Sequence, residues 1–152
     1  LLFFAGFGWA KPVPVDPDNF RIKDRAMMSV ALAGPLSNIF LAVLSGLALK
    51  LYSLSMPRLP LEMLVNTVFG QACLTGILVN LGLAFFNLIP LPPLDGSKVL
   101  NFFLSPRQRF RFQEIEAMGP FILIMVVSFG LVGKILNPAV RFGFDLIIQL
   151  YF

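Results

Sequence analysis

The chain has 152 residues, of which 57% are hydrophobic and only 13% are charged, and its formal net charge is +4. Soluble domains carry about 25% charged residues, so this balance indicates a membrane protein. The basic residues lie in the gaps between apolar runs, as in cytoplasmic loops and headgroup contacts, so we expect a lipid bilayer as partner and no nucleic acid. The single Cys73 excludes a disulfide framework, and the absence of histidine removes the commonest zinc ligand and the usual general base.

Residues 1–9 are apolar and end at the only tryptophan, Trp9. They lack the basic region of a signal peptide, so we expect them to be the end of a truncated membrane segment with Trp9 at the headgroups.

A proline-rich extended segment follows at residues 11–15. Pro12 and Pro14 lack amide protons, whereas the amides of Val13 and Val15 would point together along the other edge. A strand that pairs on one side only and a stiff polyproline spacer both remain open.

A run without charge at residues 26–49 predicts a membrane span at 26–51, and a second at residues 63–94 predicts a span at 63–89. Each is long enough to cross a hydrocarbon core of about 30 Å. Each span has a stripe of small and polar residues at spacings of three or four, which places them on one helical face. The stripes are Ala31, Gly34, Asn38, Ala42 and Ser45 in the first span, and Gly76, Asn80, Ala84 and Asn87 in the second. Such stripes predict two helices packed closely around a polar interior.

The second span is predicted to end in a rigid turn at residues 90–96, because three prolines there cannot continue an ordinary helix. Asp95 and Gly96 are typical turn formers. Asp95 is also the only acid between Glu62 and Glu114. An ionisable group where a membrane helix stops indicates a functional site.

A basic segment then predicts a surface helix, followed by a third span at 113–136 and a terminal helix at 138–152 that lies on or partly in the membrane. Residues 1–152 are thus expected to form one all-α polytopic membrane domain with about three transmembrane helices, further surface or partly inserted helices and the extended segment. Four basic residues precede the first span, two follow it and four follow the turn. The positive-inside rule therefore places the Asp95 turn near the cytoplasmic side of the cell (inner) membrane.

The pattern N-x-x-P-x-P-x-L-D-G at residues 87–96 resembles the signature of the site-2 protease family of intramembrane zinc metalloproteases. The Gly-Pro-Leu-Ser-Asn sequence at 34–38 resembles the G-P-x-x-N segment of that family. Residues 8–15 resemble a stretch of its small stand-alone bacterial members. The three matches occur in the order and spacing of the family and cover the chain from Phe7 to about Leu100.

The resemblance implies a zinc ion held by the aspartate of the L-D-G motif and by two histidines of an H-E-x-x-H helix, whose glutamate is the general base. Asp95 matches the metal ligand, and Asn87 and Asn38 match positions near the catalytic site. No H-E-x-x-H occurs here, and in the family it lies upstream of the stretch matched by residues 8–15. We therefore expect an N-terminally incomplete domain that is inactive alone.

Three functions remain open. The first is a zinc metalloprotease that cleaves membrane-embedded substrates, with Val13 and Val15 offering an edge to an extended substrate. The second is a non-catalytic membrane scaffold or regulator of the same fold, in which Asp95 only forms a turn. The third, a small transporter, would be expected to show inverted repeats or paired broken helices, and only one clear break occurs. The sequence leaves the substrate and the oligomeric state open.

Overall fold

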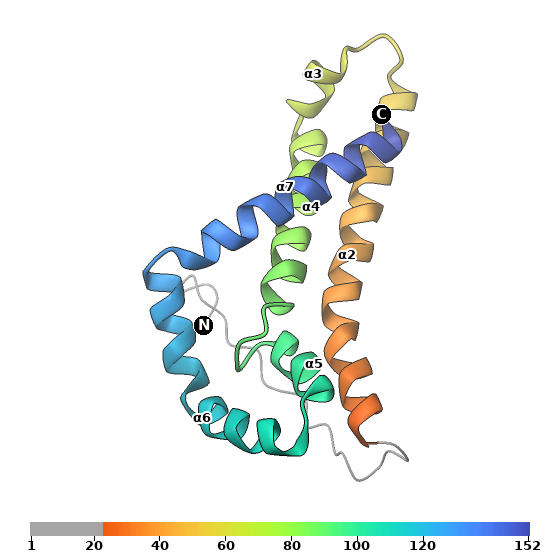
Figure 1. Ribbon diagram of the computed structural model, residues 1–152. Coiled ribbons are helices and arrows are strands. Elements are labelled where there is room, and N and C mark those ends of the chain that lie inside the picture. Colours follow the sequence, from red (N-terminus) through yellow and green to blue (C-terminus); the bar gives the residue numbers. More distant parts are fainter. Residues whose placement is uncertain (1–22) are drawn as a thin grey trace, which may run out of the picture.

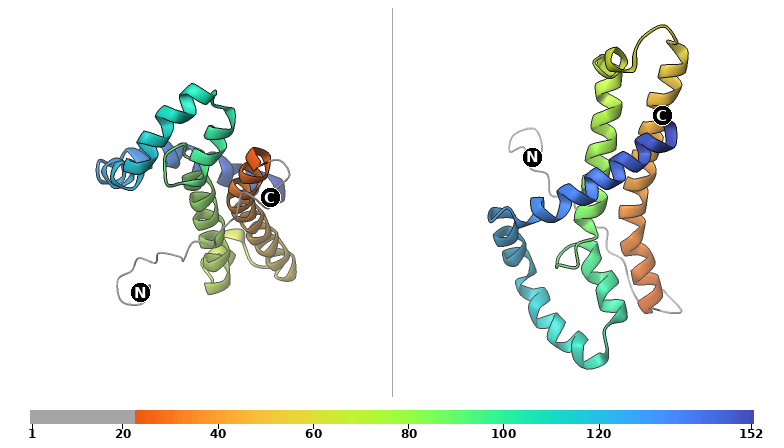
Figure 2. Two further views of the ribbon diagram at one scale, coloured as in Figure 1. Left: turned by 90° about the horizontal axis from the view of Figure 1, so that it is seen from below. Right: turned by 45° about the horizontal axis from the view of Figure 1, so that its top comes forward.

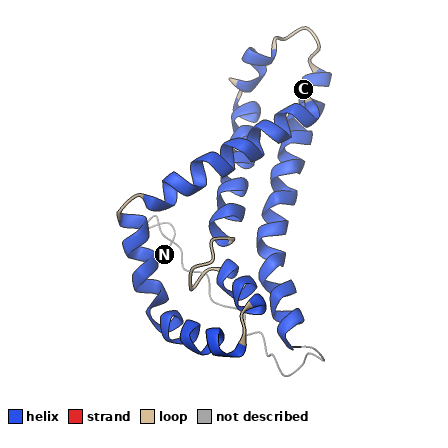
Figure 3. Cartoon of the chain, in the orientation of Figure 1, coloured by secondary structure: helices blue, strands red, loops and turns tan. Residues whose placement is uncertain are grey.

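The computed structural model describes residues 23–152, and the predicted segments at 1–9 and 11–15, with Val13 and Val15, lie outside the described residues. The described part consists of helices joined by short connections and contains no strand (Figures 1 and 3). The helices are α2 (Lys23–Ser55), α3 (Leu61–Val65), α4 (Val68–Asn87), α5 (Asp95–Phe103), α6 (Pro106–Ser128) and α7 (Leu131–Tyr151). The predicted all-α class is confirmed.

Helices α2 and α4 run side by side in opposite directions and are joined at one end by α3 (Figures 1 and 2). The two small-residue stripes meet where they pack. A Cβ atom added to Gly76 would lie 2.7 Å from Oγ of Ser45, and Ala31 and Ala42 are fully buried. Small residues let two backbones approach closely where lipid supplies no hydrophobic driving force. The predicted contact between the stripes is therefore confirmed.

Helix α7 crosses both members of this pair and completes its core (Figure 1). The side chain of Ile147 on α7 packs with Ala42 of α2 and with Ile77 and Leu81 of α4. A Cβ atom on Gly46 of α2 would lie 2.6 Å from Cγ2 of Ile147, so a glycine is needed at this crossing. The core thus lies between three helices, two of which carry the stripes.

Two helical segments, Arg25–Ser55 and Val68–Asn87, are long and apolar enough to cross a membrane. A third crossing is possible if α6 and α7, which meet at 76°, are counted as one broken span. The structure therefore has two to three candidate spans, consistent with the polytopic class.

Helix boundaries differ from three of the predicted segments. The segment 113–136 is not one helix, because α6 ends at Ser128 and α7 begins at Leu131. Gly130 between them has φ +67°, a left-handed conformation that glycine adopts at little cost and that stops a helix. The predicted terminal helix at 138–152 is the later part of α7, and the predicted span at 63–89 is divided between α3 and α4.

Candidate metal-binding site

The turn that follows α4 satisfies its backbone internally. The Leu91 amide donates to the Ile89 carbonyl at 2.7 Å, and the Leu94 amide donates to the Leu91 carbonyl at 2.9 Å. The prolines need no partner for an amide proton, and the Pro92–Pro93 peptide bond is cis. Residues 88–94 can therefore reverse the chain compactly and bring α5 back against the end of α4.

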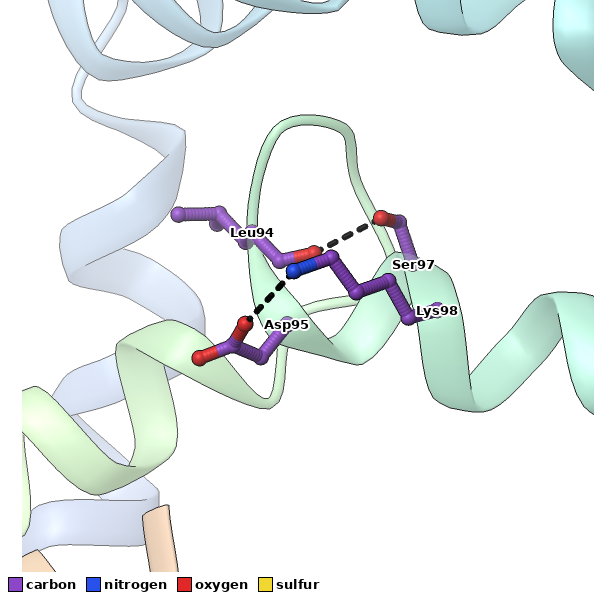
Figure 4. A network of polar contacts seen from close by, with 4 residues as sticks. All are labelled: Leu94, Asp95, Ser97 and Lys98. Atoms are coloured by element: carbon purple, nitrogen blue, oxygen red, sulfur yellow. Dashed lines mark hydrogen bonds and ion pairs between the residues drawn. The ribbon is translucent and has the colours of Figure 1, made fainter. Parts of the chain in front are cut away.

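Asp95 is the first residue of α5, so the last two residues of the predicted turn 90–96 are helical. Leu94 occupies the N-cap position in an extended conformation, and the buried Ser97 hydroxyl donates to its carbonyl at 2.7 Å (Figure 4). A carboxylate in the first helical turn interacts favourably with the positive end of the helix dipole. This preference favours a helix start at the Asp-Gly pair.

Gly96 is required by close packing. A Cβ atom at this position would overlap the carbonyl oxygens of Leu88 and Ile89 at the end of α4. On the other side of the turn, a Cβ atom on Gly119 of α6 would lie 2.8 Å from the carbonyl carbon of Pro92. These two glycine contacts hold the turn, and with it Asp95, between α4 and α6.

The carboxylate of Asp95 faces helix α2. Its Oδ1 lies 3.4 Å from Nζ of Lys98 (Figure 4). Its Oδ2 lies 3.4 Å from the place that a Cβ atom of Gly34 would occupy. The Asp95 side chain is 32% exposed. The structure thus brings the aspartate of the L-D-G motif to the glycine of the G-P-x-x-N motif.

This contact lies along the body of α2. Gly34 is nine positions beyond Arg25, where the candidate span begins. Nine positions of an α-helix correspond to about 14 Å at 1.5 Å per residue. Asp95 is therefore packed beside the helix and not at its free end.

The two asparagines lie on α2 and α4, the helices between which the chain returns to Asp95. Asn38 lies one turn beyond Gly34, on the same face of α2 and about 6 Å farther along its axis. Asn87 is the last residue of α4, where the turn to Asp95 starts. Both side chains are half-buried. No hydrogen bond between residues 23–152 joins Asp95 to either asparagine.

Two residues at this site were not among the predicted site residues. Lys98 forms an ion pair with Asp95 from the next turn of α5. Opposite charges three positions apart on a helix predict such a pair, so the sequence could have indicated it. Gly34 belongs to the small-residue stripe of α2 and to the G-P-x-x-N motif, in which Asn38 is the predicted site residue. Its contact with Asp95 joins positions far apart in the chain, so local pattern could not reveal it.

The described residues do not form a zinc site by themselves. Catalytic zinc sites have three protein ligands, and no group of three or more His, Cys, Asp or Glu occurs within residues 23–152. Asp95 is a suitable carboxylate ligand, but the sequence has no histidine to join it. No catalytic step can therefore be derived from these residues alone.

The profile of Peptidase family M50 matches residues 53–129, a range that includes α4, the turn and Asp95. The chain is 35% identical over 153 residues to "Putative zinc metalloprotease YwhC" of Bacillus subtilis, covering 99% of this chain and 68% of that protein. The chain belongs to Peptidase family M50. Membership in M50 confirms the resemblance to the site-2 protease family and makes this chain a metallopeptidase by family.

A second relative matches a smaller part of the chain. "Putative zinc metalloprotease MJ0611" of Methanocaldococcus jannaschii is 36% identical over 72 residues, which is 47% of this chain and 32% of that protein. No solved structure matches the chain. The family assignment therefore rests on the profile and on the Bacillus relative.

Proposed function

We propose that this M50 chain contributes Asp95 as a zinc ligand to an intramembrane metalloprotease that hydrolyses peptide bonds of membrane-embedded substrates. The observation that carries the proposal is the placement of Asp95 Oδ2 against Gly34 on α2, where the two family motifs meet. Zinc, when bound, would supply Lewis-acid chemistry for the activation of water. The other ligands and the general base would come from outside the described residues, so we expect the chain to bind little zinc and to be inactive alone.

The two oxygens of Asp95 have different surroundings that suit different roles. Oδ1 is paired with the Lys98 ammonium, whereas Oδ2 faces α2. Asp95 would hold the metal through its carboxylate, and Lys98, which pairs with Oδ1 from α5, would orient that carboxylate. The close packing of Gly96 fixes the backbone from which this carboxylate projects.

Asn87 and Asn38 are proposed to act beside the metal as hydrogen-bonding groups in the catalytic site. Both are half-buried amides on helices that border Asp95, and an amide both donates and accepts hydrogen bonds. In the complete protease, Asn87→Ala or Asn38→Ala should reduce kcat while zinc content is kept. An unchanged kcat in both variants would assign these residues to helix packing.

The substrate is proposed to pair as an extended strand with the edge formed by Val13 and Val15, which lie outside the described residues. Replacing either valine with proline removes the amide proton that such pairing needs. In the complete protease, Val13→Pro or Val15→Pro should slow cleavage, whereas the matched Val→Ala variants should not. Unchanged rates with several substrates would contradict this mode of recognition.

The Asp95 turn is proposed to lie near the cytoplasmic side of the cell (inner) membrane. The support is the excess of basic residues after the turn over the loop between α2 and α4. A cysteine placed at Arg111 should react with an impermeant thiol reagent only in inside-out vesicles, and one placed at Arg58 only in right-side-out vesicles. The opposite labelling pattern would overturn the orientation.

The metal assignment is tested in the complete protein by the zinc content of Asp95→Asn. The variant should lose bound zinc and keep its helical circular dichroism, because the amide preserves shape but lacks the charge. Asp145→Asn, which removes an exposed acid of α7, is the matched control and should keep its zinc. Stoichiometric zinc in Asp95→Asn would refute the ligand role.

A second candidate function, a non-catalytic scaffold or regulator, is favoured by one observation. Asp95 has a structural role that needs no metal, because it pairs with Lys98 and begins α5. An H-E-x-x-H sequence on an apolar segment of the complete gene product would support the protease, and its absence there would support the scaffold.

A further inference from the structure

Three arginines near the start of α6 look equivalent in sequence, and the structure separates them. Arg109 is half-buried and donates from Nε to the Leu104 carbonyl at 3.1 Å and from Nη2 to the Phe102 carbonyl at 3.2 Å. It therefore ties α6 to the end of α5. Arg107 and Arg111 are exposed and lie four positions apart, so they share a different face of the helix.

Neither of these two arginines is neutralised by an acid of the described chain. Between residues 23 and 152, the Asp95–Lys98 contact is the one salt bridge. Glu114 lies one turn beyond Arg111 and lowers the local charge without reaching salt-bridge distance. The paired arginines are thus available to an anion from outside.

The start of α6 is firmly placed. Ser105 and Gln108 form a capping box, in which Oε1 of Gln108 accepts from the Ser105 amide at 2.9 Å and from its hydroxyl at 2.8 Å. The capping box satisfies amide groups that would otherwise be free at the helix start. The two arginines therefore project from a fixed helical turn.

Two adjoining hollows lie at these arginines. One has a volume of about 440 Å³ and is lined by Pro106, Arg107, Phe110 and Arg111. The other has a volume of about 290 Å³ and is lined by Ser105, Arg107, Gln108 and Arg111. Both arginines line both hollows, so a single anion could contact both guanidinium groups.

Apolar side chains surround and follow the basic pair. Phe103 is 73% exposed and Phe110 is 66% exposed. Farther along α6 the exposed side chains become apolar, namely Met118, Phe121, Ile124 and Met125. Figure 2 shows α6 set apart from the α2–α4 pair, so this face is not covered by the described helices. A helix that is basic at one end and apolar at the other suits a position between headgroups and hydrocarbon.

We propose that the face formed by Arg107, Phe110 and Arg111 binds the phosphate of an anionic membrane phospholipid. The planar guanidinium groups can hold phosphate oxygens in a bidentate manner, and the exposed phenylalanines contact the acyl chains beside the headgroup. This apolar neighbourhood selects a lipid over a soluble phosphate compound or an acidic peptide. The lipid would hold the start of α6 at the membrane surface.

The test is a native mass spectrometry titration of the complete protein in detergent with dioleoylphosphatidylglycerol and, separately, with dioleoylphosphatidylcholine. Arg107→Gln/Arg111→Gln should weaken phosphatidylglycerol binding about 25-fold, at about fivefold for each basic residue near an anionic surface. Arg58→Gln/Lys134→Gln removes the same charge elsewhere and should leave binding unchanged. Equal loss in both double variants, or no preference for phosphatidylglycerol in the parent protein, would overturn the proposal.

Two further measurements distinguish lipid binding from loss of the fold and from binding of a soluble phosphate compound. Glu114→Gln removes the acid that lies one turn beyond Arg111 and should strengthen phosphatidylglycerol binding about fivefold, a gain that a damaged protein would not show. Glycerol 3-phosphate should not displace the lipid. Displacement by it, or weaker lipid binding in Glu114→Gln, would contradict the lipid site.

Discussion

The α2–α4 pair and helix α6 are two regions built in opposite ways. In the pair, small residues allow close approach, and the side chains of Ala42 and Ile77 are completely buried. In α6, Gly119 is the single buried residue, and its contact is with the turn at Pro92. The comparison shows that packing fixes the position of Asp95, while α6 presents its side chains to the surroundings. Each prediction below tests this division.

The largest effect is expected for Ile77→Ala in the core of the pair. Truncating this fully buried side chain should lower the free energy of unfolding by about 3 kcal/mol, because neighbouring helices cannot fill the space. Phe121→Ala removes a larger side chain that is 68% exposed on α6, and should change stability by less than about 0.5 kcal/mol. Denaturant titration in micelles measures both. Equal losses would show that α6 is packed as tightly as the pair.

Gly96→Ala should cost about 2 kcal/mol, since its methyl group would overlap two carbonyl oxygens at the end of α4. Gly82→Ala is the control within α4, where a Cβ atom meets nothing within 4 Å. That substitution should stabilise the helix by about 0.5–1 kcal/mol. If both variants were equally stable, the close approach of α5 to the end of α4 would be wrong.

Gly119→Ala should cost about 1 kcal/mol and act mainly on the attachment of α6, because its methyl group would meet the Pro92 backbone. Hydrogen exchange should rise in the turn and in α6 and stay low in α2 and α4. Gly133→Ala, whose nearest neighbour would be Asn137 Nδ2 at 4.0 Å, serves as the control. Faster exchange throughout the pair would mean that the two regions are not separable.

The smallest effect is expected for Lys98→Gln. The ion pair with Asp95 is partly exposed, with 44% of the lysine side chain accessible, so its loss should cost no more than about 1 kcal/mol. Thermal unfolding compared with Lys134→Gln measures the difference. A loss of several kcal/mol would show that Lys98, and not packing against Gly96, holds Asp95 in place.

The tightly packed region was more predictable from sequence than the rest. Charge-free runs located the two main spans, and the spacing of small residues predicted their contact at Ser45 and Gly76. The L-D-G motif identified Asp95 as a candidate ligand, but it did not predict that Asp95 begins a helix. Asp-Gly was read as a turn, whereas helix electrostatics and the packing of Gly96 start α5 there.

The C-terminal region was less predictable for a physical reason. Apolar composition continues through residues 117–133, so it conceals the break that Gly130 makes by its left-handed conformation. The contact between Gly34 and Asp95 is likewise tertiary and leaves no local trace. The three arginines of α6 occupy alternate positions in one basic run. Arg109 differs from the other two by its hydrogen bonds to the carbonyls of Leu104 and Phe102, which the sequence does not reveal.

The central claim, that the Asp95 carboxylate faces Gly34 between α5 and α2, is tested most directly by cysteine cross-linking in a Cys73→Ala background. The Gly34→Cys/Asp95→Cys pair should be joined by the shortest bis-methanethiosulfonate reagent. The Ser45→Cys/Gly76→Cys pair, where a Gly76 Cβ atom would lie 3.3 Å from that of Ser45, should form a direct disulfide and serves as the positive control. Cross-linking of both pairs is the predicted result. A bridge at 45–76 without any at 34–95 would place Asp95 away from α2 and contradict the account.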